Sequence, residues 1–269
     1  MSGINVVKWG GKTQLYDREK IRVTLVKYRL NEAEVNQVLD LVEENLYDGI
    51  STKEIFNLIE DKIGSRPRIL KNDLRSALGE MGPKPDFEVF VQKLLEKMGY
   101  TVRDDREIVG RCVEHEIDGV AEKDGKLYYI ETKHHSKTHT KTPFIHTLAA
   151  KAKLDDIRHG FLDGKNAYDF ERVILLCNTR LTSHANRYAK CVGIQHIGWK
   201  TPDGGMEKLI RETKTYPVTI LGSASKTEKK KLLGTNIVTL DDLLDTSYIP
   251  KISPRRIEEL KSEAQKIIS

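Results

Sequence analysis

The stretch EHEIDGVAEKDGKLYYIETKHH (114–135) is expected to form a β-hairpin, with Asp118 on the strand before its turn and Glu131 on the strand after it. Asp124 and Gly125 suit the two central positions of a tight hairpin turn, which require positive φ angles. A two-residue turn fixes the register of the paired strands, so we expect Asp118 to lie directly opposite Glu131. The hairpin therefore predicts two carboxylates at one place on a sheet.

The same register puts Glu116 opposite Lys133, and because side chains alternate along a strand, both would share a face with Asp118 and Glu131. Carboxylates on Cβ atoms roughly 5 Å apart resist simultaneous ionisation unless a cation lies between them. A hard divalent ion such as Mg²⁺ fits, since it binds one or two carboxylates together with water and phosphate oxygens. A solvent-facing strand with scattered charges is the alternative. Apolar neighbours on both faces favour metal binding, because buried acids need a partner.

The elements around this hairpin predict an α/β domain over 84–222. A helix from Asp86 carries one apolar stripe, and later helices are expected near 146–162 and 183–192. Strands are expected at 100–104, 111–121, 126–133, 171–177 and 194–199. This order of helix, several strands, and then alternating helix and strand predicts an α/β sandwich.

Asp118 followed by Glu131-Thr132-Lys133 resembles the D…(D/E)-x-K signature of the restriction-endonuclease-like (PD-(D/E)xK) superfamily. The flanking stretches FEVFVQKLLEKMGY and VILLCNTRLTSHANRYAKCVGIQHIGW resemble its Mrr-like branch, so the resemblance covers about residues 85–222. It implies a restriction-endonuclease-like α/β/α sandwich with a mixed sheet, and metal-dependent hydrolysis of phosphodiester bonds in DNA.

The resemblance also implies roles for single residues. Asp118 and Glu131 would hold Mg²⁺ or Mn²⁺, and Glu88, the usual acid of the first helix, would be a third metal ligand. Lys133 would orient or help deprotonate the attacking water and stabilise the negative charge that develops. Two alternatives stay open. Glu88 could be a solvated residue that the helix dipole stabilises, and Glu116 could pair with Lys133 or join the metal shell.

Several histidines gather beside the hairpin, and they raise the question of a zinc site. They are His115, His134, His135 and His139. Cys112 precedes His115 by three residues, but a second half-site with matching spacing is missing. A basic loop that faces the phosphate backbone and a solvated loop are the other interpretations. The same two interpretations apply to Lys151 and Lys153 on the next helix.

Residues 1–80 open with VVKWGGKTQLYDREKI, which resembles the start V-x-K-R-x-G…F-D-x-x-K-I of the ATP-cone, a regulatory nucleotide-binding module. The later DGISTKEI resembles a helix start of that module, with Glu54 at capping-box spacing from Ser51. Carried over by position, an adenine nucleotide (ATP or dATP) would be surrounded by Val6, Lys8, Asp17, Lys20 and Thr52.

Trp9 stands where the cone usually has arginine, and this departure speaks against triphosphate binding. A degenerate cone that serves docking or dimerisation is the alternative. A nucleotide bound here would regulate the nuclease rather than fuel it, because the sequence has no Walker-type GxxxxGK[ST] motif.

Residues 226–269 predict a small helical unit. The segments LLGTNIVTLDDLL and ISPRRIEELKSEAQKI resemble a helix-hairpin-helix, which binds phosphates through backbone N–H groups at a helix N-terminus. The hairpin at 234–236 would do this here with the help of lysines 229–231. An ordinary helical cap is the alternative.

Composition sets the outer limits. The chain has 269 residues with 38% hydrophobic content, enough for a substantial core and two or three domains. A net charge of +5 permits a nucleic-acid partner. Because the sequence shows no bilayer-length apolar run and no signal segment, and has three scattered cysteines, it predicts a reduced, cytoplasmic protein without a membrane partner.

The sequence as a whole predicts a Mg²⁺-dependent DNA endonuclease with an ATP-cone-like regulatory domain (1–80), a nuclease domain (84–222) and a helical unit (226–269). A homodimer is expected, because one such site cuts one strand. Two rival hypotheses are a nucleotide-sensing DNA-binding regulator that does not cleave, and a structure-specific junction resolvase.

Overall fold

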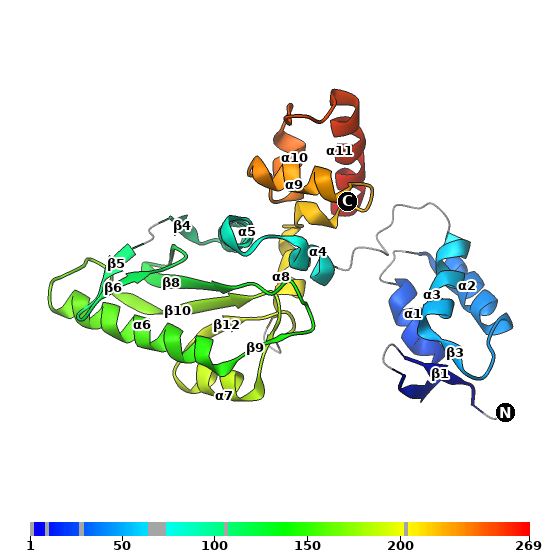
Figure 1. Ribbon diagram of the computed structural model, residues 1–269, viewed down its shortest axis with the longest axis horizontal. Helices are drawn as coiled ribbons and strands as arrows, with labels where there is room; N and C mark the ends of the chain where they lie inside the picture. The colour runs from blue at the N-terminus through cyan, green and yellow to red at the C-terminus, as the bar shows by residue number, and fades with distance from the viewer. Residues whose placement is uncertain (1–2, 9–10, 27–29, 64–73, 105–106, 202–203) are drawn as a thin grey trace. The chain divides into compact units, whose positions relative to one another are not determined.

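The computed structural model describes residues 3–8, 11–26, 30–63, 74–104, 107–201 and 204–269. Contacts divide the chain into two compact units, Met1–Lys71 and Asn72–Ser269, each drawn with its elements in Figure 1. Each unit has its own hydrophobic core. The functional boundaries at 80, 84, 222 and 226 remain predictions.

In its described residues the first unit combines a small sheet with three helices. Its strands are β1 (Asn5–Val7), β2 (Thr13–Leu15) and β3 (Ile50–Ser51). Its helices are α1 (Arg18–Val26), α2 (Glu32–Glu44) and α3 (Thr52–Ile63). β1 pairs antiparallel with β2 and parallel with β3. The predicted capping box is confirmed: the Ser51 hydroxyl accepts the Glu54 N–H at 3.1 Å, and the Glu54 carboxylate accepts the Ser51 N–H at 3.0 Å.

The second unit is built on a sheet whose described strands have the order β12-β10-β8-β7-β4. They are β4 (Thr101–Arg103), β7 (Val120–Lys123), β8 (Lys126–Lys133), β10 (Phe170–Cys177) and β12 (Gln195–Ile197). β8, β10 and β12 run parallel, whereas β7 is antiparallel to both β8 and β4. The predicted mixed α/β fold is therefore confirmed.

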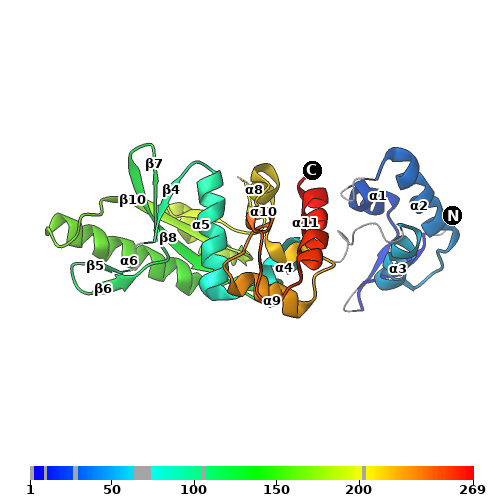
Figure 2. The same cartoon turned by 90° about the horizontal axis from the view of Figure 1, so that it is seen from above.

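Helices cover both faces of this sheet (Figure 1). The helices next to it are α5 (Glu88–Lys97), α6 (Phe144–Leu162) and α7 (Ser183–Cys191). α5 packs on the face that carries Ile130 and Ile174, and it lies across the sheet in Figure 2. α6 and α7 pack on the opposite face, against Tyr129 and Leu175. This alternation along each strand produces the three layers.

Shorter elements complete the second unit. Two small sheets pair β5 (Glu107–Val109) with β6 (Glu114–Glu116), and β9 (Lys141–Thr142) with β11 (Arg180–Leu181). The remaining elements are α4 (Leu74–Glu80), the turn η1 (Pro83–Phe87), α8 (Met206–Thr213), η2 (Val218–Ile220), α9 (Lys226–Gly234), α10 (Leu240–Asp245) and α11 (Pro254–Ile268). None of the helices in the described residues is long and apolar enough to cross a bilayer.

The C-terminal helices α9 to α11 share one hydrophobic core with α4 and α5. Lys229 is buried and donates to the Glu80 carboxylate at 2.8 Å. The expectation that Lys229 faces phosphate is therefore wrong, because this lysine forms an internal ion pair. Lys231 donates to the Lys251 carbonyl at 2.8 Å, so it too holds this unit together.

The hairpin register is confirmed at its turn and fails further out. β7 and β8 pair from Lys123–Lys126 to Val120–Tyr129, as predicted. Beyond this point Ile130 donates its N–H to the Gly119 carbonyl, while the Ile130 carbonyl accepts the N–H of Asp118. Two consecutive residues thus share one partner, which is the arrangement of a β-bulge.

A glycine makes this departure possible. Gly119 has a φ of 143°, and a Cβ built on it would lie 3.1 Å from the Arg103 carbonyl oxygen. After the bulge, Glu116 pairs with Glu107 in β6 and β5. The predicted pairing of Glu116 with Lys133 is therefore wrong, and Asp118 does not take the expected ladder position opposite Glu131.

A histidine on β12 gives a prediction for stability. Both ring nitrogens of His196 are buried without a hydrogen-bond partner among the described residues, and burial lowers the pKa of His196 to about 4. The unfolded chain takes up this proton near pH 6.5, so the folded state loses up to roughly 3 kcal/mol as the pH falls from about 6.5 to 4. We expect His196→Leu to reduce this loss in urea unfolding measured across that range. His159→Gln is the control, because His159 is exposed. If His196→Leu loses as much unfolding free energy as wild type between about pH 6.5 and 4, the buried neutral His196 is not the cause of the loss.

Candidate functional site

One cleft of about 360 Å³ collects charged side chains from η1, α5, β6, β8 and α6. Its lining comprises Pro83, Lys84, Glu88, Glu116, Asp118, Glu131, Thr132, Lys133, His134 and Lys153. The structure thus brings together all four predicted nuclease residues, Glu88, Asp118, Glu131 and Lys133. The first three are buried, with at most 7% of each residue exposed.

Asp118 is hydrogen-bonded to the end of β8, where the bulge has interrupted the pairing of β8 with β7. Its carboxylate Oδ2 accepts the Thr132 N–H at 2.7 Å and the Thr132 hydroxyl at 2.9 Å. The Asp118 side chain thus satisfies a backbone donor of β8 that has lost its partner strand. These two hydrogen bonds fix the orientation of the Asp118 carboxylate. Its other oxygen, Oδ1, lies 3.7 Å from the Lys84 ammonium.

Glu131 lies between two lysines at the end of β8. Its Oε1 accepts from Lys133 at 2.5 Å, and its Oε2 accepts from Lys153 of α6 at 3.1 Å. Oε2 also accepts the hydroxyl of Tyr129 at 3.4 Å. Burial and the Glu131 charge raise the pKa of Tyr129 well above its usual value, so this hydroxyl remains a donor.

Glu88 begins α5 and enters the cleft from the other face of the sheet. It is 3% exposed, and its Oε1 lies 3.4 Å from the ammonium of Lys84. Lys84 also donates to Glu116 at 2.5 Å, and this bond lowers the pKa of Glu116. Glu88 is therefore part of the charged cluster and is not the solvated helix-start residue of the alternative interpretation.

Sequence reasoning missed Lys84, Thr132 and the position of Lys153. Lys153 follows Ala150, a buried sheet-facing residue of α6, by three positions, so the helical period carried a signal that places both on one face. Lys84 lies in the turn before α5, at the start of the predicted nuclease domain, and the sequence pattern gave it no role. No periodicity could have aimed this lysine at the cleft.

The donor set of the cleft suits a hard divalent cation. Carboxylate oxygens are the ligands that Mg²⁺ and Mn²⁺ prefer, and three buried carboxylates line this cleft. Within the described parts of the chain, however, no three His, Cys, Asp or Glu side chains are already gathered closely enough to hold a metal ion. Lysine ammonium groups form ion pairs with all three of these carboxylates.

Three of the four histidines beside the hairpin each have a different hydrogen-bond partner. His115 bonds Asp156 at 2.8 Å, His134 bonds the Leu78 carbonyl at 2.9 Å, and His135 bonds the Thr142 hydroxyl at 3.1 Å. Burial lowers the pKa of both His134 and His135. The zinc alternative finds no clustered ligands among the described residues.

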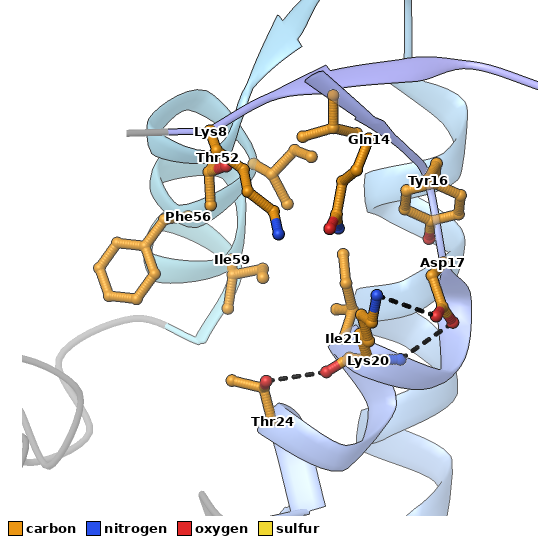
Figure 3. A pocket seen from close by; sticks show the side chains of 12 residues that line it. Lys8, Gln14, Tyr16, Asp17, Lys20, Ile21, Thr24, Thr52, Phe56 and Ile59 are labelled. Carbon is orange, nitrogen blue, oxygen red and sulfur yellow. Dashed lines mark hydrogen bonds and ion pairs between the residues drawn. The ribbon is translucent and has the colours of Figure 1, made fainter. Parts of the chain in front are cut away.

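A second hollow, of about 440 Å³, lies in the first unit (Figure 3). Its lining includes all five residues predicted to surround a nucleotide: Val6, Lys8, Asp17, Lys20 and Thr52. Figure 3 shows Gln14 of β2 and Lys8, the residue after β1, extending into the hollow. The Lys20 ammonium lies 3.5 Å from the Asp17 carboxylate, at the start of α1. Trp9, the departure from the cone pattern, lies outside the described residues.

The comparisons with known proteins assign the second unit. Residues 80–198 match the restriction endonuclease family of the Mrr catalytic type, and residues 216–268 match the AF1548-like C-terminal family. An uncharacterized protein of Archaeoglobus fulgidus is 32% identical over 181 residues, which cover 65% of this chain and 98% of the relative. The chain belongs to the AF1548-like family.

A solved structure extends this assignment of the AF1548-like chain. The crystal structure of the protein of unknown function AF1548 has a TM-score of 0.55 and 27% sequence identity, and it covers 73% of this chain and 98% of that one. The restriction-endonuclease match contains all four predicted nuclease residues, and it suggests a nuclease that binds DNA. The ATP-cone resemblance of the first unit stays a prediction.

Proposed function

We propose that this AF1548-like protein is an endonuclease that hydrolyses DNA phosphodiester bonds with the help of Mg²⁺ or Mn²⁺. The observation that carries the proposal is the convergence of Glu88, Asp118, Glu131 and Lys133 on one cleft inside the restriction-endonuclease match. Buried carboxylates are costly for a fold and are retained where chemistry needs them.

In this proposal Asp118, Glu131 and Glu88 hold the metal ion. A bound Mg²⁺ would neutralise charge on the scissile phosphate and lower the pKa of water. Thr132 keeps the Asp118 carboxylate oriented through two hydrogen bonds. Lys153 of α6 donates to Glu131 and restricts the rotation of its side chain. The proposed metal ligands are thus oriented by one residue of the sheet, Thr132, and one residue of the helix layer, Lys153.

Lys133 performs the second part of the chemistry. Its ammonium lies at the end of β8 beside Glu131, within the lining of the same cleft. There the ammonium orients the attacking water and stabilises the negative charge that develops on the phosphate oxygens. A homodimer would bring two such clefts to the two strands of a duplex.

Supercoiled plasmid provides the test. The wild-type protein is expected to convert it to nicked or linear DNA with Mg²⁺ or Mn²⁺, and to lose this activity with a chelator. DNA binding without nicking under every metal condition would leave the non-cleaving regulator as the function. Cleavage of branched but not linear duplex would identify a junction resolvase.

We also propose that the hollow of the first unit binds ATP or dATP and regulates the nuclease. Two lysines that line it suit phosphate charge, and its apolar residues Val6, Ile21 and Ile55 suit a base. The rival function for this unit is docking or dimerisation.

Lys8→Ala is expected to weaken binding of ATP and dATP by about tenfold, which corresponds to about 1.4 kcal/mol. The reason is that the Lys8 ammonium extends into the hollow where phosphates would lie (Figure 3). Isothermal titration calorimetry measures the change. Lys12→Ala is the matched control, because Lys12 is exposed on the same hairpin and does not line the hollow. No heat from either nucleotide with the wild-type protein would contradict nucleotide binding.

A further inference from the structure

The ammonium group of Lys84 lies among three carboxylates of the cleft. Its ammonium lies 2.5 Å from Glu116, 3.4 Å from Glu88 and 3.7 Å from Asp118. Two of these acids, Glu88 and Asp118, are among the three that the proposed function assigns to the metal ion. A divalent cation drawn to these carboxylates therefore meets a lysine that is already there.

The two sides of the cleft are balanced differently. Glu131 is neutralised by Lys133 and Lys153, whose side chains are 28% and 29% exposed. Glu88 and Asp118 have Lys84 instead, and its side chain is 56% exposed. Lys84 can therefore swing into solvent at small cost, because a long, strongly hydrated side chain loses little when its ammonium returns to water.

The carboxylates cannot follow it. Glu88 and Asp118 have side chains that are 3% and 9% exposed, and Asp118 is bonded twice to Thr132. If Lys84 leaves without a replacement, Glu88 and Asp118 both lose the positive charge of its ammonium while their own side chains stay buried. The cluster is thus built to hold one cation at a time, either the ammonium or a metal ion.

We propose that Lys84 is a resident counter-ion that stabilises the metal-free cleft and that a divalent ion must displace in order to bind. This inference rests on the proposed metal-dependent function. It makes Lys84 a residue that sets the metal concentration at which the cleft is loaded. Lys84 then weakens metal binding by the free energy of its own contacts with Glu88 and Asp118.

The test is a titration of the full-length protein with Mn²⁺, in the absence of DNA, followed by calorimetry. Lys84→Gln is expected to bind Mn²⁺ about tenfold more tightly than wild type, because the competing charge is gone. Lys84→Arg keeps the charge and can bond two carboxylates at once, so it is expected to bind Mn²⁺ more weakly than wild type. Lys93→Gln is the matched control, because Lys93 lies on α5 and pairs with Asp242, outside the cleft lining.

Melting temperatures measured with and without Mn²⁺ give a second test, which also shows whether each variant is folded. Without metal, Lys84→Gln is expected to melt at a lower temperature than wild type, and Mn²⁺ is expected to raise its melting temperature by a larger amount. Equal or weaker Mn²⁺ affinity in Lys84→Gln would overturn the counter-ion role.

The plasmid assay separates this failure from failure of the proposed function. If wild type nicks plasmid with Mn²⁺ while Lys84→Gln binds the metal no more tightly, only the role of Lys84 is wrong. If wild type neither binds Mn²⁺ nor nicks plasmid, the metal-dependent nuclease and the counter-ion are both wrong.

Discussion

Asp118→Asn is expected to lower the Mg²⁺-dependent nicking rate by on the order of 10³-fold, because charge stabilisation at a metal site is worth several kcal/mol and each 1.36 kcal/mol is tenfold in rate. The asparagine removes the negative charge and keeps an oxygen that can accept the Thr132 N–H, now at 2.7 Å. Because this acceptor is kept, the end of β8 should retain its structure. The loss therefore reports on the charge that binds metal and not on the fold.

A matched control lies on the neighbouring strand. Glu122 belongs to β7, is exposed, and does not line the cleft, so Glu122→Gln removes one carboxylate charge at a distance from the site. It should nick plasmid at the wild-type rate. Single-turnover rates and thermal melts are compared for the three proteins. An Asp118→Asn protein that is folded and nicks as fast as wild type would disprove the role of Asp118.

Sequence alone predicted the members of this cleft better than their arrangement. The turn at Asp124-Gly125 is local chemistry, and its register was correct as far as Val120–Tyr129. The bulge at Gly119 was not predictable, because the Arg103 carbonyl that crowds it comes from a different strand. Asp118 and Glu131 still line the same cleft, because the Asp118 side chain bonds Thr132 and so stays beside the end of β8 that carries Glu131.

The cations of the cleft show the same division. Lys133 follows Glu131 by two residues, and strand alternation was enough to place both on one face. Lys84 depends on the path of the turn η1, which tertiary packing decides, and nothing in its neighbours pointed to Glu88 and Asp118. The histidines failed as zinc candidates because distant groups such as Asp156 and the Leu78 carbonyl bond them.

Lys133→Met is expected to lower the nicking rate by on the order of 10²- to 10³-fold, the range that loss of a positioned proton-transfer or charge-stabilising group produces. The thioether keeps the length and the apolar stem of the side chain but supplies no charge. Metal binding should persist, because Glu131 keeps Lys153 as its neighbour at 3.1 Å and Lys133 is not a metal ligand. A large loss of rate with retained Mn²⁺ affinity therefore separates the role of Lys133 from the role of Asp118, whose replacement should weaken both.

Lys126→Met is the control for this change, because Lys126 begins the same strand, is exposed, and pairs with Glu171 outside the cleft. It should nick plasmid like wild type. Lys133→Arg should recover only part of the rate, since it restores the positive charge but places a planar guanidinium where a compact ammonium lay 2.5 Å from Glu131. If Lys133→Met nicks as fast as Lys126→Met, the ammonium of Lys133 takes no part in hydrolysis and serves only to neutralise Glu131.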